Sequence, residues 1–233
     1  MVVYLIIGDY MDLLFSKIYK TFVFQDRYLL FLEGFRNTII LTILSFICGI
    51  LFGILISFAV SSKNETLRKS VTFIRSLLIE IPTMVLLMIF VYLIFGESAV
   101  PVFWIVAAAL TLKSAAFLSE IFMTCLSVVN RGEIEAARTL GMTSLQAFKF
   151  VVLPQVVQAA LPLCKNQFIT TMQETSVVGY LAVMDLTRAS SVVSSRTLDA
   201  FFGLILITVI YFLVGATGKG LLNSIARFCR IKM

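Results

Sequence analysis

Residues 38–60 read TIILTILSFICGILFGILISFAV and contain no charged side chain. An α-helix rises about 1.5 Å per residue, so about 20 apolar residues cross about 30 Å of hydrocarbon. The stretch therefore predicts a transmembrane helix. The whole chain agrees, because 60% of its 233 residues are apolar, only 14% are charged and the mean hydropathy is +1.01. Soluble domains have about 45–50% apolar and about 25% charged residues, so the sequence predicts an all-α integral membrane protein.

Further hydrophobic stretches on the C-terminal side bring the expected number of spans to five. The fourth of these is interrupted by polar residues and by two prolines, and residues 183–199 are expected to form a loop before the fifth. An amphipathic helix at the membrane surface is expected near the N-terminus, with Leu13, Leu14, Ile18 and Phe22 on one face. The expected spans are 36–60, 76–96, 102–126, 155–182 and 200–221. The expected regions are an N-terminal interfacial segment at 1–33, a transmembrane domain at 34–223 that includes a cytoplasmic loop at 126–153, and a cytoplasmic tail at 224–233.

The first span carries a stripe of small side chains at every fourth residue: Ser45, Gly49, Gly53 and Ser57. In lipid, helices associate where such stripes let their backbones approach closely. The sequence favours a packing face inside this subunit and leaves a dimer contact as the alternative.

Basic residues predict the orientation, because short cytoplasmic loops collect lysine and arginine. Three segments carry most of them, so these segments are expected inside and the N-terminus outside. Four basic residues near the N-terminus (Lys17, Lys20, Arg27 and Arg36) oppose this orientation and are outweighed. The formal charge of +6 is attributed to loops that face anionic lipid rather than to nucleic-acid binding. The three segments contain Lys63, Arg68, Lys69 and Arg75; Arg131, Arg138 and Lys149; and Arg227, Arg230 and Lys232.

Several kinds of chemistry are excluded by composition. The chain has no histidine, which excludes a Ser-His-Asp triad and a histidine-bound zinc site. Its four cysteines lie far apart without a CxxC pair, so no metal site is predicted. A phosphate-binding loop needs GxxxxGK[ST], and the similar run GATGKG at 215–220 lacks the first glycine and the final Ser or Thr. We therefore expect no catalytic residue and no cofactor bound by this chain.

Residues 130–154 read NRGEIEAARTLGMTSLQAFKFVVLP. Asn130, followed three residues later by Glu133, predicts a helix start in which the asparagine side chain accepts from the Glu133 N–H. The run EAARTL favours helix, Gly141 suits the left-handed position after a helix, and residues 143–146 predict a second capping box. The loop should fold as a helix, a glycine turn and a second helix. These residues leave two interpretations open: a docking surface for another subunit, or an ordinary interfacial helix–turn–helix.

The spacing in this loop resembles the EAA motif of binding-protein-dependent ABC transporter permeases, E-A-A-x3-G-x9-I-x-L-P. Residues 135–137 are EAA, Gly141 follows at the family spacing, and residues 151–154 are VVLP, with valine in place of isoleucine. The likeness extends over about 34–222. Within it, GFRNTIILTILS, AAFLSEIF and QETSVVGYLAVMDL are most similar to the polar amino-acid (glutamine/arginine/histidine-type) branch. The resemblance implies a type-1 ABC importer permease fold with five transmembrane helices.

The resemblance also implies a function and partners. The chain would be the membrane-spanning permease subunit of an ATP-driven amino-acid importer in the bacterial inner membrane, with ATP and magnesium bound by a separate ATPase. It would assemble with two ATPase subunits, a second permease copy or a sister subunit, and an extracytoplasmic substrate-binding protein. The amino acid and the choice between homodimer and heterodimer stay open. The residues implied for ATPase coupling are Glu135, Ala136, Ala137, Gly141, Leu153 and Pro154.

Polar residues within the expected spans are candidates for a substrate pathway. An ionised side chain at the centre of a span costs about 2.5–3.5 kcal/mol on insertion scales, so it normally faces the bundle interior. Either Glu120 and Glu174 face a central cavity and hold the amino or cationic group of an amino acid, or Lys113 pairs with Glu120 or Glu80 and only stabilises the bundle. The pathway candidates are Glu120, Glu174, Gln173, Asn166, Lys113 and Glu80.

Three alternative functions remain after these predictions. A permease for another small polar solute in the same superfamily is the strongest alternative. An ion-driven secondary transporter is disfavoured because such folds usually contain internal repeats and more spans. An intramembrane enzyme is disfavoured because the spans contain no pair of aspartates and the chain contains no histidine.

Overall fold

The structure is a computed structural model that describes residues 15–231, and every described element is helical. The part of the expected interfacial segment that includes Leu13 and Leu14 lies outside these residues. The described chain begins with short helical turns, η1 (Tyr19–Val23) and η2 (Phe24–Asp26), before the first long helix. Among the described residues, four helices are long and apolar enough to cross a membrane, or five if one sharply bent pair counts as a span. The expected all-α membrane fold is confirmed.

Helices α2 (Tyr28–Val60) and α5 (Val102–Val128) pack closely along their length and form the centre of the molecule. The small-residue stripe of α2 lies in this contact. A Cβ atom on Gly49 would stand 2.7 Å from the Ser114 hydroxyl oxygen, and one on Gly53 would stand 3.1 Å from the Ala115 carbonyl oxygen. The stripe is therefore covered inside the subunit, as the favoured interpretation predicts, and the dimer-contact alternative is not supported.

The second expected span, 76–96, does not form one straight helix. Helix α3 (Glu65–Glu80) ends before Pro82, and α4 (Thr83–Met88) with the π-helical η3 (Ile89–Ile94) leaves at an angle of 111°. Proline has no N–H and disfavours helical backbone at the residue before it, and Ile81 is extended with φ −66° and ψ 128°. The expected range thus begins inside α3 and crosses this break.

The fourth expected span forms a continuous helical stretch, Ser144–Leu181. It consists of α7 (Ser144–Ala147), the π-helical η4 (Phe148–Val152), α8 (Leu153–Glu174) and the 3₁₀ turn η5 (Thr175–Leu181). Pro162 lies inside α8 without ending it. Prolines are tolerated in membrane helices where neighbouring groups satisfy the freed carbonyls.

A helix, α9 (Leu186–Thr197), occupies the range expected to be a loop. Its N-cap is Asp185, whose side chain accepts from the backbone N–H groups of Arg188 at 2.8 Å and Thr187 at 3.3 Å. The serine-rich sequence of α9 gives little helical signal, so this helix is determined by its cap and its packing against α2 and α10 (Ala200–Ile231).

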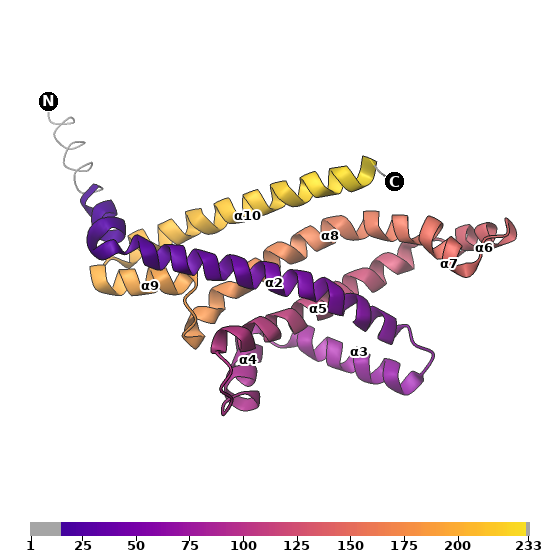
Figure 1. The fold of residues 1–233 in the computed structure, drawn as a ribbon, viewed down its shortest axis with the longest axis horizontal. Coiled ribbons are helices and arrows are strands. Elements are labelled where there is room, and N and C mark those ends of the chain that lie inside the picture. The colour runs from indigo at the N-terminus through magenta and orange to yellow at the C-terminus, as the bar shows by residue number, and fades with distance from the viewer. Residues whose placement is uncertain (1–14, 232–233) are drawn as a thin grey trace.

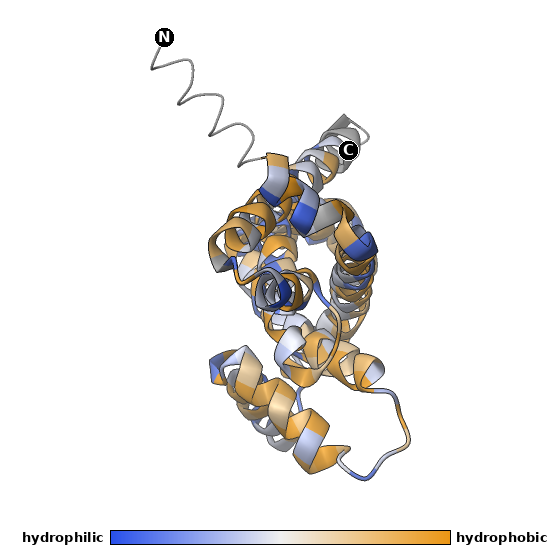
Figure 2. Ribbon diagram, turned by 90° about the vertical axis from the view of Figure 1, so that its left-hand side faces the viewer, coloured by the Kyte–Doolittle hydropathy of each residue, from blue (hydrophilic) through white to orange (hydrophobic). Residues whose placement is uncertain are grey.

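The helices are arranged along one long axis (Figure 1). The short helices α6 (Arg131–Thr139) and α7 lie at one end, whereas α9 and the beginning of α2 lie at the other. Viewed along this axis, much of the helical ribbon consists of hydrophobic residues (Figure 2). Many large apolar side chains are exposed on the single chain, including Leu51, Phe58 and Leu93, and such a surface suits a lipid environment.

Candidate functional site

The α6 helix begins at its predicted cap, with one difference in detail. The Asn130 side chain accepts from the Gly132 N–H at 2.9 Å, rather than from the expected Glu133 N–H. The Glu133 carboxylate does not return to the cap, because its Oε2 accepts from Nε2 of Gln155 on α8 at 2.6 Å. This contact ties α6 to the base of α8 and so helps to fix the direction of α6.

The turn between α6 and α7 has the predicted backbone. Gly141 adopts φ +88°, a conformation that residues with a Cβ rarely take. The second capping box is confirmed: Thr143 accepts from the Gln146 N–H at 3.3 Å, and the Gln146 side chain accepts from the Thr143 N–H at 2.8 Å. Residues close together in sequence therefore define the shape of this loop.

One face of α6 is open. Glu135 and Ala136 are exposed, and Leu140 at the end of the helix is 82% exposed. Ala137, which the resemblance also implies for ATPase coupling, is only 5% exposed and faces the chain itself. At the start of α8, Leu153 is 40% exposed and Pro154 is half-buried. The open face thus combines a carboxylate, a small side chain and an uncovered leucine at one end of the molecule.

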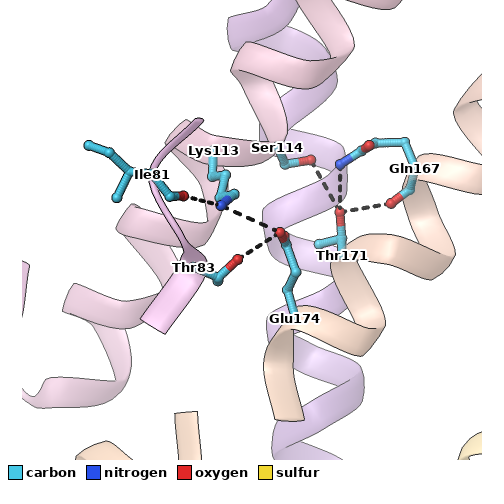
Figure 3. A network of polar contacts seen from close by, with 7 residues as sticks. All are labelled: Ile81, Thr83, Lys113, Ser114, Gln167, Thr171 and Glu174. Atoms are coloured by element: carbon cyan, nitrogen blue, oxygen red, sulfur yellow. Dashed lines mark hydrogen bonds and ion pairs between the residues drawn. The ribbon is translucent and has the colours of Figure 1, made fainter. Parts of the chain in front are cut away.

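A second polar site lies between the break after α3 and helices α5 and α8 (Figure 3). Lys113 Nζ donates to the Ile81 carbonyl at 2.7 Å and lies 3.8 Å from Glu174 Oε1. The same carboxylate oxygen accepts from the Thr83 hydroxyl at 2.9 Å. The side chains of Lys113 and Glu174 are only 5% and 14% exposed. The sequence considered Glu120 and Glu80 as partners of Lys113, and both pairings are wrong because Glu174 holds that place.

Uncharged polar groups extend this site along α5 and α8. Thr171 lies 3.5 Å from the Ser114 hydroxyl, donates to the Gln167 carbonyl at 2.9 Å and accepts from Gln167 Nε2 at 3.4 Å. All three of these residues are buried. The sequence did not identify Thr83, Gln167 or Thr171. Their signal is weak, because a hydroxyl or amide within a span often bonds only to its own helix.

The other four pathway candidates do not join this cluster. Glu80, Glu120, Asn166 and Gln173 are each exposed on the surface of the single chain. Only Lys113 and Glu174, among the six candidates, are brought together by the fold.

A half-open pocket of about 450 Å³ lies between η5, α9 and the first turns of α10. Its lining includes several hydroxyl groups and Arg188, whose Nη1 donates to the Gly179 carbonyl at 2.6 Å. Helix α9, which supplies part of the lining, lies at the opposite end of the molecule from α6 (Figure 1). Among residues 15–231, no group of three or more histidine, cysteine or acidic side chains could hold a metal ion.

Comparison with known proteins identifies the family. The family model for the binding-protein-dependent transport system inner membrane component matches residues 49–230 of this chain. The chain belongs to this family. This permease is 27% identical over 213 residues to a putative glutamine transport system permease protein of Rickettsia conorii, covering 90% of this chain and 95% of that one. It is 30% identical over 187 residues to a probable amino-acid ABC transporter permease protein of Bacillus subtilis, covering 78% and 81%.

Solved structures agree with the fold. The permease superposes on a chain from the crystal structure of an amino acid ABC transporter with histidines, with a TM-score of 0.78, 31% identity, and coverage of 85% of this chain and 93% of that one. A chain of the MetNI methionine ABC transporter in an inward-facing conformation has the same fold, with a TM-score of 0.67 at 20% identity, covering 86% of this chain and 98% of that one.

These findings confirm the family resemblance, the ABC importer permease fold and the place in a multi-pass inner-membrane complex. They also confirm that nucleotide binding and hydrolysis belong to a separate ATPase subunit. The family implies that the complex contains ATPase subunits and a binding protein.

Proposed function

We propose that this permease forms the translocation path of an amino-acid importer. In this proposal, the open face of α6 contacts the ATPase and transmits its conformational change to the membrane helices. The observation that carries the coupling proposal is the exposure of Glu135 and Ala136 on a helix fixed by its cap, by Gly141 and by the Glu133–Gln155 contact. Amino acids are supported as substrates by the names of the relatives in Rickettsia and Bacillus and of the histidine-containing structure.

In the proposed coupling site, each residue has a physical role. The Glu135 carboxylate pairs with a basic residue of the ATPase, and Ala136 allows close approach of the two surfaces. Ala137 packs inward and supports the helix, while Gly141 turns the chain back toward the membrane. Leu153 and Pro154 begin α8, which carries motion of α6 into the membrane.

The proposed substrate path runs past Lys113 and Glu174 at the centre of the bundle. The four exposed candidates, Glu80, Glu120, Asn166 and Gln173, face away from the chain's own core. A second permease copy or sister subunit covers this surface in our proposal, so that both subunits line one path. This arrangement accounts for the exposed Glu120 on α5, a helix that is otherwise mostly apolar.

The proposed orientation places α6 and α7 with two ATPase subunits in the cytoplasm and the N-terminus outside. The distribution of Lys and Arg supports it, since Lys63 precedes α3, Arg68, Lys69 and Arg75 lie within α3, and the α6–α7 loop is also basic. The binding protein would then meet the opposite end, where α9 and the serine-rich pocket lie.

The test is affinity purification of the tagged permease from its native host. We expect an ATPase subunit to copurify with the wild type and to be lost from Glu135→Lys, because the exposed carboxylate has no role in the chain's own packing. Glu97→Lys is the matched control, since it makes the same charge change at an exposed site in the turn before α5. The purified complex is then assayed for ATP hydrolysis stimulated by amino acids.

Two results would contradict the proposal. A Glu135→Lys chain that keeps the ATPase and its stimulation by amino acids would contradict coupling through the open face of α6. A complex stimulated only by other small polar solutes would keep the permease but change its substrate class.

A further inference from the structure

The Lys113–Glu174 pair is incompletely bonded, although both side chains are buried. Their separation of 3.8 Å is about 1 Å longer than a charge-assisted hydrogen bond. Glu174 Oε2 is buried and has no hydrogen-bond partner among the described residues. Lys113 has three N–H donors, and its Nζ contacts the Ile81 carbonyl and Glu174 Oε1. The pair therefore retains an acceptor and a donor for a ligand.

No other charged residue of α4, α5 or α8 lies close to the pair along its own helix. The other charged residues of α4, α5 and α8 are Glu120 and Lys165. Glu120 is two helical turns from Lys113, about 10 Å along the axis, and it is exposed. Lys165 is more than two turns from Glu174 and donates to Asn223 at 2.6 Å. The cluster thus contains one positive and one negative charge among neutral hydroxyls and an amide.

We propose that Lys113 and Glu174 form a charge-balanced site for zwitterionic amino acids with uncharged side chains, in which Lys113 selects against cationic substrates. The inference rests on the proposed function and names the substrate class of that site. The α-ammonium of the ligand binds Glu174 Oε2, and its α-carboxylate binds Lys113. The ligand and the pair each have zero net charge, so binding leaves no excess charge in a region of low dielectric.

A cationic amino acid brings one more positive charge to the same site. Without Lys113 the site would carry the single negative charge of Glu174, and a cationic ligand would be favoured instead. Specificity in this arrangement comes from a repulsive element as much as from an attractive one.

The experiment uses the purified permease–ATPase complex without its binding protein, so that selectivity belongs to the membrane subunit. Glutamine, serine, lysine, arginine and glutamate are compared by ligand-induced thermal shift and by stimulation of ATP hydrolysis. For the wild type, we expect glutamine and serine to act at lower concentration than lysine or arginine. For Lys113→Gln, we expect the ratio of half-saturating concentrations to move toward the cationic amino acids by about tenfold or more, equivalent to about 1.4 kcal/mol.

Two further variants sharpen the result. Lys113→Gln/Glu174→Gln restores a neutral site, so its preference should return to uncharged amino acids with weaker binding overall. Lys165→Gln is the matched control, because it removes a lysine of α8 that bonds elsewhere, and its selectivity should equal that of the wild type.

Each outcome bears on the inference. A wild-type preference for lysine or arginine overturns it, as does a Lys113→Gln complex that assembles with unchanged selectivity. If Lys113→Gln fails to assemble, the wild-type preference still decides. A wild-type complex that responds to none of the amino acids contradicts the proposed function itself, whereas a response with the wrong selectivity contradicts only the charge-balance inference.

Discussion

The α6–α7 loop is formed by residues close together in the chain, whereas the Lys113–Glu174 cluster joins three separate helical regions. In the loop, the caps at Asn130 and Thr143 act within three residues. In the cluster, the Thr83–Glu174 contact spans 91 positions and the Lys113–Ile81 contact spans 32. The loop also keeps its polar face exposed, while the cluster buries its charges. Short-range contacts can thus be derived from sequence spacing, and long-range pairing requires the packed fold.

The largest expected effect follows from breaking the buried pair. Lys113→Gln leaves the Glu174 charge without its nearby cation, and loss of one partner of a buried pair costs about 3–5 kcal/mol. We expect a clear loss of thermal stability in detergent. A double-mutant cycle with Glu174→Gln measures the coupling, and the double variant should be more stable than Lys113→Gln alone. Strictly additive effects would mean that the two side chains do not interact.

The next effect concerns the turn in the loop. Gly141→Ala places a Cβ at φ +88°, which costs about 1–2 kcal/mol through the backbone alone, because no atom lies within 4 Å of that Cβ position. We expect the complex to keep its membrane fold and to lose most substrate-stimulated ATP hydrolysis.

Gly132→Ala is the control for this change. Gly132 lies in the first turn of α6, and its Cβ position has an ordinary contact of 3.4 Å with Asn130 Oδ1. Alanine favours helix over glycine by about 1 kcal/mol, so this variant should couple normally. An equal loss of substrate-stimulated ATP hydrolysis in Gly132→Ala and Gly141→Ala would show that any added methyl group disturbs the loop. The left-handed backbone at Gly141 would then not be the cause.

A smaller effect is expected at the second cap. Thr143→Ala removes the side-chain acceptor for the Gln146 N–H and should cost about 1 kcal/mol of local stability. Faster amide hydrogen exchange at residues 144–147, with unchanged exchange in α5, is the expected result. Thr143→Ser keeps the hydroxyl and should exchange at the wild-type rate; faster exchange in this variant would contradict the capping explanation.

The smallest effect is expected for the partly exposed ion pair Lys17–Asp199, which has an Nζ–Oδ2 distance of 2.7 Å. The bond from Lys17, with further bonding from the Phe202 N–H, lowers the pKa of the Asp199 carboxyl from its ordinary value of 3.8. A lowered folded-state pKa contributes stability above the ordinary value, and this contribution is lost as the pH falls through the folded pKa.

Comparison of the wild type with Asp199→Asn measures this contribution. The two midpoints of thermal unfolding should differ slightly at pH 7 and converge as the pH falls below the ordinary carboxyl pKa and through the lowered folded-state pKa. Because both side chains are in contact with water, the difference should be far smaller than for Lys113→Gln. If Asp199→Asn changed the midpoint as much as Lys113→Gln does, the result would contradict the conclusion that burial makes the Lys113–Glu174 pair the stronger contributor to stability.

The features that could be predicted from the sequence are those formed by short-range contacts, whereas those that depend on long-range pairing could not. The uncharged run at 38–60 and the motif around Gly141 carry their own signals, so a helix through the first run and the turn after α6 were predicted correctly. The direction change at Pro82 was missed because hydropathy averages over the break. Helix α9 was missed because its serines favour no element by themselves. Glu174 and Lys113 were both predicted as candidates, but their pairing was not, because charge and spacing along one helix favoured Glu120 as the partner of Lys113.

The π-helical turn Phe148–Val152 lies between the α6–α7 loop and α8, so its geometry bears on the direction in which α6 points. A π turn holds about one residue more than an α turn, and each α-helical residue corresponds to a rotation of about 100°. Loss of one residue here would let an ordinary α-helix form and leave α6 pointing in nearly the same direction, because four α-helical residues turn the chain about as far as five π-helical ones. Loss of a second residue would then rotate α6 by roughly 100° about the axis of α8, with Glu135, Ala136 and Gly141 all retained. Crosslinking from position 135 to the ATPase would distinguish the two deletions. The π turn thus gives the segment between Gly141 and Pro154 one residue of tolerance in length before the direction of Glu135 changes.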